Sequence, residues 1–151
     1  MDQPIDVRPV LRGEFLYVVD AGGNCRQLNV HSFDVDGQRT LPAPVRQIWS
    51  VGKSTLAWAG DGKLYCLEDG KTLAEKWTFD LNTLEPVGQS VVEGEIVWLG
   101  CRDGTVLAID INTGQETKRI KLPQALSIGL RKVKKLFIAV AADGSIYRID
   151  D

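Results

Sequence analysis

The 151-residue sequence predicts an all-β protein built from repeated small sheets. Three observations lead to this prediction: four apolar tetrads recur at a constant spacing, a polar turn follows each tetrad, and a second apolar run follows each turn. A continuous apolar run of this length is typical of a strand that is buried on both faces. Aspartate and glycine tolerate the left-handed backbone of a tight turn, so each repeat is expected to contain a β-hairpin.

The tetrads occupy residues 16–19, 56–59, 96–99 and 136–139, so their spacing is forty residues throughout. All of their positions are apolar or aromatic, and Trp58 and Trp98 share one column, which indicates core packing for both. The second strands are expected at residues 25–28, 64–67, 106–109 and 146–149. Each repeat therefore has two central strands joined by a turn.

Weaker strands are expected on either side of each hairpin. Those before the tetrads lie at residues 4–11, 44–50, 86–92 and 125–130, and three of them open with proline. Gly13, Gly52 and Gly94 form the turns before the first three tetrads, and residues 132–135 form the fourth. Outer strands are expected at residues 39–41, 77–81 and 117–122, and the fourth repeat has none. Residues 71–79 have a helical alternative, because Leu73 and Trp77 are four residues apart, but their place in the repeat favours a strand.

A period near forty residues with about four strands is typical of β-propeller blades. We therefore expect a single propeller-type domain over residues 1–151, with blades at about 4–43, 44–85, 86–124 and 125–151. Four blades make a partial or small propeller, and its last blade lacks the outer strand. Each blade is apolar on both faces, so it needs neighbouring blades to be stable.

Composition excludes several classes of function. The net charge of −2 and the pI of about 5.4 provide no basic field that would hold nucleic acid. No apolar run approaches the roughly 18 residues of a membrane span, and the N-terminus has no signal segment. A cytoplasmic location is expected if the chain is complete, and a periplasmic or extracellular one if it was excised from a longer protein.

The residues that usually carry catalysis or bind metals are few. Cys25, Cys66 and Cys101 contain no Cys-x-x-Cys pair, which argues against a disulfide framework and a thiolate zinc site. We expect all three to be buried free thiols. His31 is the only histidine and is expected at the surface, so no Ser-His-Asp triad can be proposed. The sequence predicts no catalytic residues, no metal site and no cofactor.

Residues 108–118 resemble the repeat of the quinoprotein-alcohol-dehydrogenase-like propellers, the pyrroloquinoline-quinone-repeat superfamily. Ala108, Asp110, Thr113 and Gly114 match its pattern Ala-x-Asp-x-x-Thr-Gly, and Lys118 stands at the position of the following tryptophan. The resemblance implies an eight-bladed ring in the enzymes, which hold the quinone and calcium with vicinal cysteines and an aspartate base. No vicinal cysteine pair exists here, so the chain resembles the non-enzymatic members, such as the lipoprotein scaffold of outer-membrane β-barrel assembly.

The expected function is therefore that of a non-catalytic binding or scaffold module for protein–protein interaction. Only three residues precede the first expected strand, so the N-terminus is not expected to supply the missing outer strand. An open edge follows, whose residues are Ile146, Tyr147, Arg148 and Ile149. Either a second copy, completing a ring by strand addition, or a longer parent protein would cover this edge. The alternative is a fragment of a quinone-dependent dehydrogenase propeller.

Polar residues of the hairpin turns form a second candidate site. In a closed ring these turns would meet at one end and make a rim for a cation or a basic peptide. The candidate rim residues are Asp20, Asn24, Asp61, Arg102, Asp103 and Asp143. The alternative is that the aspartates only make their turns.

Two weaker surface features complete the candidates. Residues 131–135 are a basic run that either docks an acidic partner or is simply solvated. Trp49 and Trp77 lie outside the tetrads and are expected to be partly exposed, which would suit glycan binding.

Overall fold

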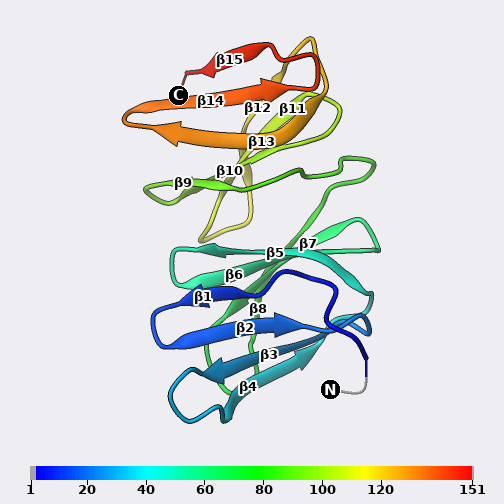
Figure 1. The fold of residues 1–151 in the computed structure, drawn as a ribbon, viewed down its shortest axis with the longest axis vertical. Coiled ribbons are helices and arrows are strands. Elements are labelled where there is room, and N and C mark those ends of the chain that lie inside the picture. The colour runs from blue at the N-terminus through cyan, green and yellow to red at the C-terminus, as the bar shows by residue number, and fades with distance from the viewer. Residues whose placement is uncertain (1–2, 151) are drawn as a thin grey trace. The chain divides into compact units, whose positions relative to one another are not determined.

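Fifteen β-strands and no helix make up residues 3–150, the part of the chain that the computed structural model describes. The strands form four antiparallel sheets, here called sheets 1 to 4 in chain order (Figure 1). The chain divides into two compact units, one ending at Asp80 and the other beginning at Leu81. The first unit contains sheets 1 and 2, and the second contains sheets 3 and 4.

Within each sheet the strands follow one another in chain order. Sheet 1 consists of β1 (Val10–Arg12), β2 (Phe15–Val19), β3 (Asn24–Asn29) and β4 (Val35–Thr40). Sheet 2 consists of β5 (Val45–Val51), β6 (Ser54–Ala59), β7 (Lys63–Glu68) and β8 (Glu75–Asp80). Sheet 3 consists of β9 (Val91–Glu93), β10 (Ile96–Gly100), β11 (Thr105–Asp110) and β12 (Glu116–Lys121). Sheet 4 consists of β13 (Leu126–Val133), β14 (Leu136–Ala141) and β15 (Ile146–Ile149).

The four hairpins predicted from the tetrads are confirmed. Every tetrad lies in the second strand of its sheet, and every following apolar run lies in the third. Residues 71–79 contain strand β8 rather than a helix, so the interpretation based on the repeat is also confirmed. Sheet 4 has three strands, in agreement with the missing outer strand.

The first strand is shorter than predicted. Only Val10 and Leu11 of the expected segment 4–11 belong to β1, which extends to Arg12. Pro4 and Pro9 have no amide hydrogen to donate to a sheet, which explains why pairing does not extend through this segment. The segment instead packs on the first unit: Val7 is buried in its core, and the carbonyl of Pro4 accepts the N–H of Ala21 at 2.8 Å.

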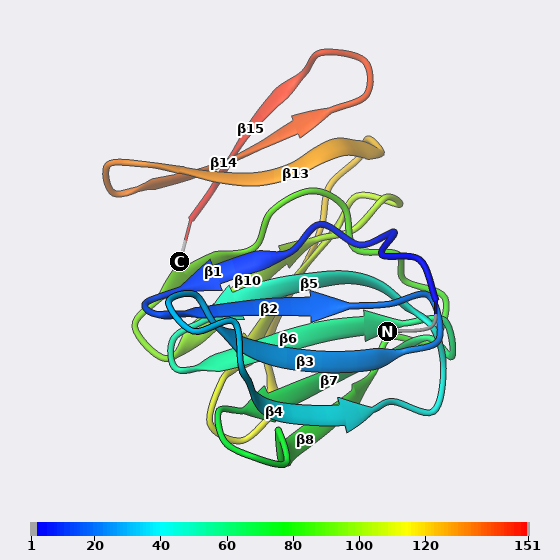
Figure 2. The same cartoon turned by 60° about the horizontal axis from the view of Figure 1, so that its bottom comes forward.

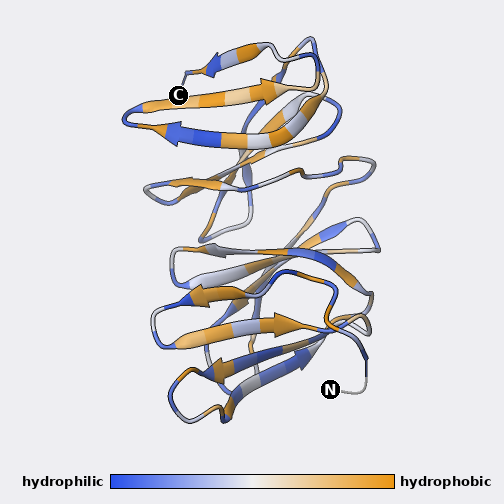
Figure 3. Ribbon diagram, viewed as in Figure 1, coloured by the Kyte–Doolittle hydropathy of each residue, from blue (hydrophilic) through white to orange (hydrophobic). Residues whose placement is uncertain are grey.

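Two other strands also differ from the expectation. In the segment 86–92 only Val91 and Val92 are in β9, because Gly88 with φ of 64° interrupts the extended chain. β13 is longer than expected and runs to Val133, so the hairpin turn contains only Lys134 and Lys135. Arg131 and Lys132 are therefore strand residues, and they give the end of β13 its hydrophilic colour in Figure 3.

Equivalent residues of the four sheets are identified by their hairpin turns and not by the constant spacing of the tetrads. In every sheet a glycine with positive φ donates its N–H to the carbonyl three residues earlier. These glycines are Gly23, Gly62, Gly104 and Gly144, so the structural spacing is 39, 42 and 40 residues. Trp58 and Trp98 consequently occupy different positions: Trp98 is equivalent to Leu56, and Trp58 lies two residues further along its strand. Trp98 is buried, as expected, whereas Trp58 is half-buried.

Each unit has its own core between its two sheets. In the first unit Tyr17, Val19 and Cys25 pack in one cluster with Ile48 and Ala57. In the second unit the ring centroids of Trp98 and Phe137 are 5.6 Å apart, and Val106, Ala108 and Leu130 pack around them. Burial of these apolar faces supplies the main stabilisation of each pair of sheets.

The expected exposure of Trp49 and Trp77 is wrong. Their exposed fractions are 2% and 8%, because each tryptophan lies within a sheet strand, opposite Leu56 and Cys66 respectively, rather than in a loop. Neither ring is available to stack on a sugar, so glycan binding by these two residues has no structural basis.

Candidate functional site

β15 forms an open edge of sheet 4. It pairs with β14 through four residue pairs, from Ile146–Val140 to Ile149–Phe137 (Figure 2). Within residues 3–150 no strand pairs with its other side, whereas β3, β7 and β11 each pair with an outer strand. A row of backbone N–H and C=O groups is therefore left for another segment.

The four predicted edge residues alternate between the two faces of sheet 4. Ile149 is buried and Tyr147 is half-buried in the core of the second unit. Ile146 is 69% exposed on the opposite face, beside Arg148, whose Nε contacts the Asp150 carboxylate at 2.7 Å. The strand is thus anchored on one face, and its outer backbone and second face remain accessible.

Three of the predicted rim aspartates occupy one equivalent position, directly before the turn glycine. The carboxylates of Asp61, Asp103 and Asp143 each accept the backbone N–H two residues later, at 3.1, 2.9 and 2.9 Å. This local hydrogen bond is the one that stabilises aspartate in tight turns. One oxygen of each carboxylate therefore serves its own turn.

Asp20 occupies a different position, three residues before its turn glycine, and is fully buried. Its carboxylate accepts the N–H groups of Gly22 at 2.9 Å and Asn24 at 3.0 Å, and also the Asn24 side-chain amide. Burial acts to raise the pKa of Asp20, but these hydrogen bonds outweigh burial and hold the pKa below its ordinary value. Asp20 thus organises its turn and offers little to a ligand.

The remaining rim residues also have partners within their own unit. Lys121 contacts the Asp103 carboxylate at 2.5 Å, and the Tyr65 hydroxyl donates to Asp61 at 2.6 Å. Arg102 pairs with Glu85 at 3.0 Å. Asp20, Asn24 and Asp61 belong to the first unit, and Arg102, Asp103 and Asp143 belong to the second. A common rim of all six remains a prediction.

The three cysteine side chains are packed in the protein interior. Cys25, Cys66 and Cys101 are buried and unpaired, as expected. Burial raises the pKa of the Cys25 and Cys101 thiols to about 12 and that of Cys66 to about 11. His31 is exposed, with its Nε2 3.9 Å from Glu14. No group of three or more His, Cys, Asp or Glu side chains in residues 3–150 is placed to hold a metal ion.

The basic run is divided between a strand and a turn. Lys132 forms an ion pair with Glu93 and lies 6.0 Å from the ring centre of Phe137, so it ties sheet 4 to sheet 3. Arg131 lies on the opposite face of β13, and Lys134 and Lys135 are in the exposed turn. Docking of an acidic partner on the other three residues remains a prediction.

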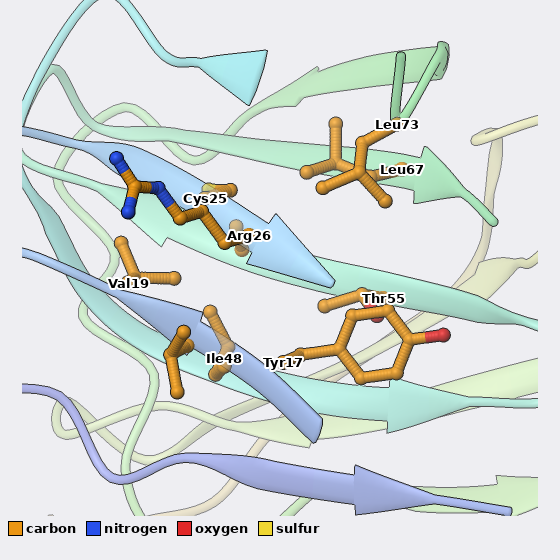
Figure 4. A pocket seen from close by; sticks show the side chains of 10 residues that line it. Tyr17, Val19, Cys25, Arg26, Ile48, Thr55, Leu67 and Leu73 are labelled. Carbon is orange, nitrogen blue, oxygen red and sulfur yellow. The ribbon is translucent and has the colours of Figure 1, made fainter. Parts of the chain in front are cut away.

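The space between sheets 1 and 2 does not form a ligand site. Figure 4 shows Tyr17, Val19 and Ile48 on one side of it and Leu67 and Leu73 on another. The cavity has a volume of about 10 Å³, which is close to the least space that a single water molecule needs. This pocket belongs to the core.

No protein-family model matches the chain, and no curated protein does either. Solved structures do match. BamB from Moraxella catarrhalis superposes with a TM-score of 0.83 at 15% identity over 99% of this chain and 47% of BamB. The computationally designed protein Ika4 gives 0.79 at 16% identity over 99% of this chain and 92% of Ika4. The Cps50 (Swd1) β-propeller domain of Myceliophteria thermophila gives 0.75 at 12% identity over 95% of this chain and 52% of that domain.

The likeness to these structures establishes the fold. The chain consists of four β-propeller blades, and the last blade lacks its outer strand. It spans about half the length of BamB and of the Cps50 domain. Within residues 3–150 there is no helix of the length and hydrophobicity needed to cross a membrane.

Proposed function

We propose that this chain is a non-catalytic protein-binding module of the β-propeller type, and that its partner adds an extended segment to β15. The observation that carries the proposal is the open edge: sheet 4 is one strand short, and β15 has a free side. Strand addition would satisfy the free backbone groups, and the accessible face beside Ile146 would select side chains.

The outer strands of the other sheets indicate which kind of segment fits. β4, β8 and β12 occupy the corresponding place beside β3, β7 and β11, and most of their side chains are exposed. The third and fifth residues are the more covered ones: Gly37 and Trp77 are buried, and Arg39, Phe79, Lys118 and Ile120 are half-buried. We therefore expect a polar, extended partner segment with its third and fifth residues directed toward the sheet.

We assign the module to the non-enzymatic pyrroloquinoline-quinone-repeat type, because the four matching residues perform a structural task here. Asp110 accepts the N–H groups of Asn112 and Thr113, both at 2.8 Å, and Gly114 has a φ of 74°. Ala108 is fully buried, which leaves room for a neighbouring side chain. The motif closes the turn between β11 and β12, and a turn needs no bound quinone.

The absence of catalysis is part of the proposal, and the thiols support it. A thiol must ionise to act as a nucleophile, and burial raises the pKa of all three thiols to about 11 or 12. Alkylation with iodoacetamide at neutral pH is therefore expected to be slow in the folded protein and fast after unfolding. Rapid modification of the folded protein would contradict this part of the proposal.

Strand addition can be tested with a synthetic peptide of residues 115–122, which contain β12. Peptide binding is expected to slow hydrogen exchange of the β15 amides by at least about tenfold. The control is the same peptide with N-methylated backbone amides, which cannot form the hydrogen bonds and should give no protection. If neither peptide slows exchange at β15, the edge is not a strand-binding site and the proposal is wrong.

A further inference from the structure

The exposed large apolar side chains are confined to the two terminal repeats. Among residues 3–150 they are Ile5, Leu11, Phe33, Val35, Ile128, Val133, Leu136 and Ile146. None of them belongs to sheet 2 or sheet 3. Apolar groups that gather in this way indicate surfaces that are covered in the functional protein.

Sheet 1 has one face that no other sheet of its unit covers. Leu11, Leu16, Leu28 and Val35 are paired in register across all four strands, so their side chains share that face. Val18, which is 5% exposed, lies on the same face, which we call the free face of sheet 1. Leu11 is 63% exposed and Val35 is 48% exposed.

Sheet 4 has a corresponding free face. Val133 pairs with Leu136, and Val140 pairs with Ile146, on the side opposite the core of the second unit. Ile138 lies between these pairs, flanked by Arg131 and Arg148. Val133, Leu136 and Ile146 are 49%, 41% and 69% exposed. The free face of sheet 4 is formed by Arg131, Val133, Leu136, Ile138, Val140, Ile146 and Arg148.

The two free faces are the two sides of one type of contact. Sheet 1 packs on sheet 2 through the face that carries Tyr17, and sheet 3 packs on sheet 4 through the face that carries Trp98. Tyr17, Trp98 and Ile138 lie the same number of residues before the turn glycines of their sheets, so the three positions are equivalent. The free face of sheet 4 carries Ile138. It therefore corresponds to the face with which sheet 1 packs on sheet 2 and sheet 3 packs on sheet 4.

The receiving sides are equivalent in the same way. Ala57 in sheet 2 and Ala139 in sheet 4 receive the preceding sheet, and their equivalent in sheet 1 is Val18. The free face of sheet 1 is therefore of the kind that receives a preceding sheet. A sheet equivalent to sheet 4 is what the repeat would place there.

One pair of positions shows how the contact is made. Between sheets 1 and 2 the Arg12 side chain donates to the Ser50 hydroxyl at 3.3 Å, and between sheets 3 and 4 Lys132 pairs with Glu93. The strand registers make Arg12 and Glu93 equivalent to Val133.

By the same registers, Ser50 and Lys132 are equivalent to Leu11. The next contact in the series would therefore join Val133 to Leu11. Val133 and Leu11 are exposed apolar residues, whereas the equivalent contacts within the chain join polar side chains. Burial of apolar surface would therefore stabilise the contact between Val133 and Leu11.

We propose that two copies of this chain associate, with the free face of sheet 4 of each copy packed on the free face of sheet 1 of the other. A second copy covers both faces at once and closes the contact by two-fold symmetry. The chain also spans about half of BamB and of the Cps50 propeller domain, so two copies supply a comparable number of blades. This association uses the side chains of the sheet faces, whereas strand addition uses the backbone edge of β15; Ile146 and Arg148 are the β15 residues that belong to the free face.

The test is a charge exchange at the Val133–Leu11 contact, followed by analytical ultracentrifugation of the full chain. The wild-type chain is expected to sediment as a species of twice the 16.6 kDa chain mass. Leu11→Asp and Val133→Lys should each weaken association by at least about tenfold, because each places an unpaired charge in both contacts. Gln115→Asp is the control: Gln115 is exposed, lies in the turn between β11 and β12 of sheet 3, away from both free faces, and should leave association unchanged.

Mixing Leu11→Asp with Val133→Lys, or combining both in one chain, brings the two charges together and is expected to restore the dimer. This rescue also shows that the single variants fold. A wild-type chain that stays monomeric at all concentrations would overturn the proposal, as would a dimer that tolerates Leu11→Asp. Failure of rescue would show that these two residues do not meet. The peptide experiment at β15 can be repeated on a monomeric variant, so the two proposals fail separately.

Discussion

Asp20 shows how one buried carboxylate organises a turn. Since its oxygens accept the N–H groups of Gly22 and Asn24, Asp20→Asn would replace an acceptor by a donor that faces other donors. We expect a loss of about 1–2 kcal/mol in the free energy of unfolding at neutral pH, measured by urea denaturation. Asp36→Asn, at an exposed residue, is the control and should change stability little.

The effect of Asp20→Asn on stability should also depend on pH. The folded-state pKa of Asp20 is lowered, so its contribution to stability is present above the unfolded-state pKa and is lost as the pH falls through the folded-state value. The stability difference between wild type and Asp20→Asn should therefore shrink toward about pH 3. A difference that is constant down to that pH would contradict the role given to the charge.

Substitutions at Gly129 and Gly144 distinguish the cost of a steric clash from the cost of backbone strain. Both glycines have positive φ, 75° for Gly129 and 88° for Gly144. A Cβ on Gly129 would lie 2.1 Å from the carbonyl oxygen of Val87, whereas a Cβ on Gly144 would have no neighbouring atom within 4 Å. Gly144→Ala is expected to cost about 1 kcal/mol and Gly129→Ala at least about 3 kcal/mol. Thermal unfolding of the two variants would measure this, and equal effects would show that the approach of Val87 does not constrain the site.

At the scale of elements, Arg12, Tyr17 and Asp69 tie sheet 1 to sheet 2. The Tyr17 hydroxyl donates to Asp69 at 2.6 Å, and the Arg12 guanidinium contacts Asp69 and lies 4.4 Å from the centre of the Tyr17 ring. Tyr17→Phe removes only the hydroxyl and is expected to cost about 1–2 kcal/mol in urea denaturation at neutral pH. Tyr147→Phe, at a half-buried tyrosine of sheet 4, is the control.

Burial and the hydrogen bond to Asp69 raise the pKa of Tyr17 to about 12. A raised pKa stabilises the fold below the unfolded-state value of about 10, and this contribution is lost as the pH rises toward 12. Wild type should therefore lose more stability over that interval than Tyr17→Phe does. An identical loss in both proteins would show that the tie does not depend on the neutral hydroxyl.

The elements also show what sequence could and could not predict. Alternation of tetrads and Asp-Gly turns is a local signal, so the hairpins and the open edge at Ile146–Ile149 were predictable. The burial of Trp49 and the engagement of Lys132 with Glu93 depend on neighbouring strands and sheets, which no local pattern contains. The free faces could not be found either, because the constant tetrad spacing conceals the structural spacing of 39, 42 and 40 residues.

At the scale of the whole molecule, exposed apolar surface gathers in the first and last repeats. A repeat protein normally protects its terminal repeats with polar outer faces, since each inner repeat is covered by two neighbours and a terminal one by only one. Leu11 and Val35 at one end, and Val133, Leu136 and Ile146 at the other, depart from that rule. The departure is understandable if the two ends meet those of a second copy.

Association of two copies should make thermal stability depend on protein concentration. If two folded copies bind each other and the unfolded chains do not, association stabilises the fold by mass action, and the Tm should rise over a roughly hundredfold increase in concentration. The Tm of Leu11→Asp should stay constant over the same range, because the contact that couples folding to association is lost. Calorimetry on both proteins measures the difference. A constant wild-type Tm would mean that no second copy covers the end faces, and the exposed leucine and valine side chains would need another partner.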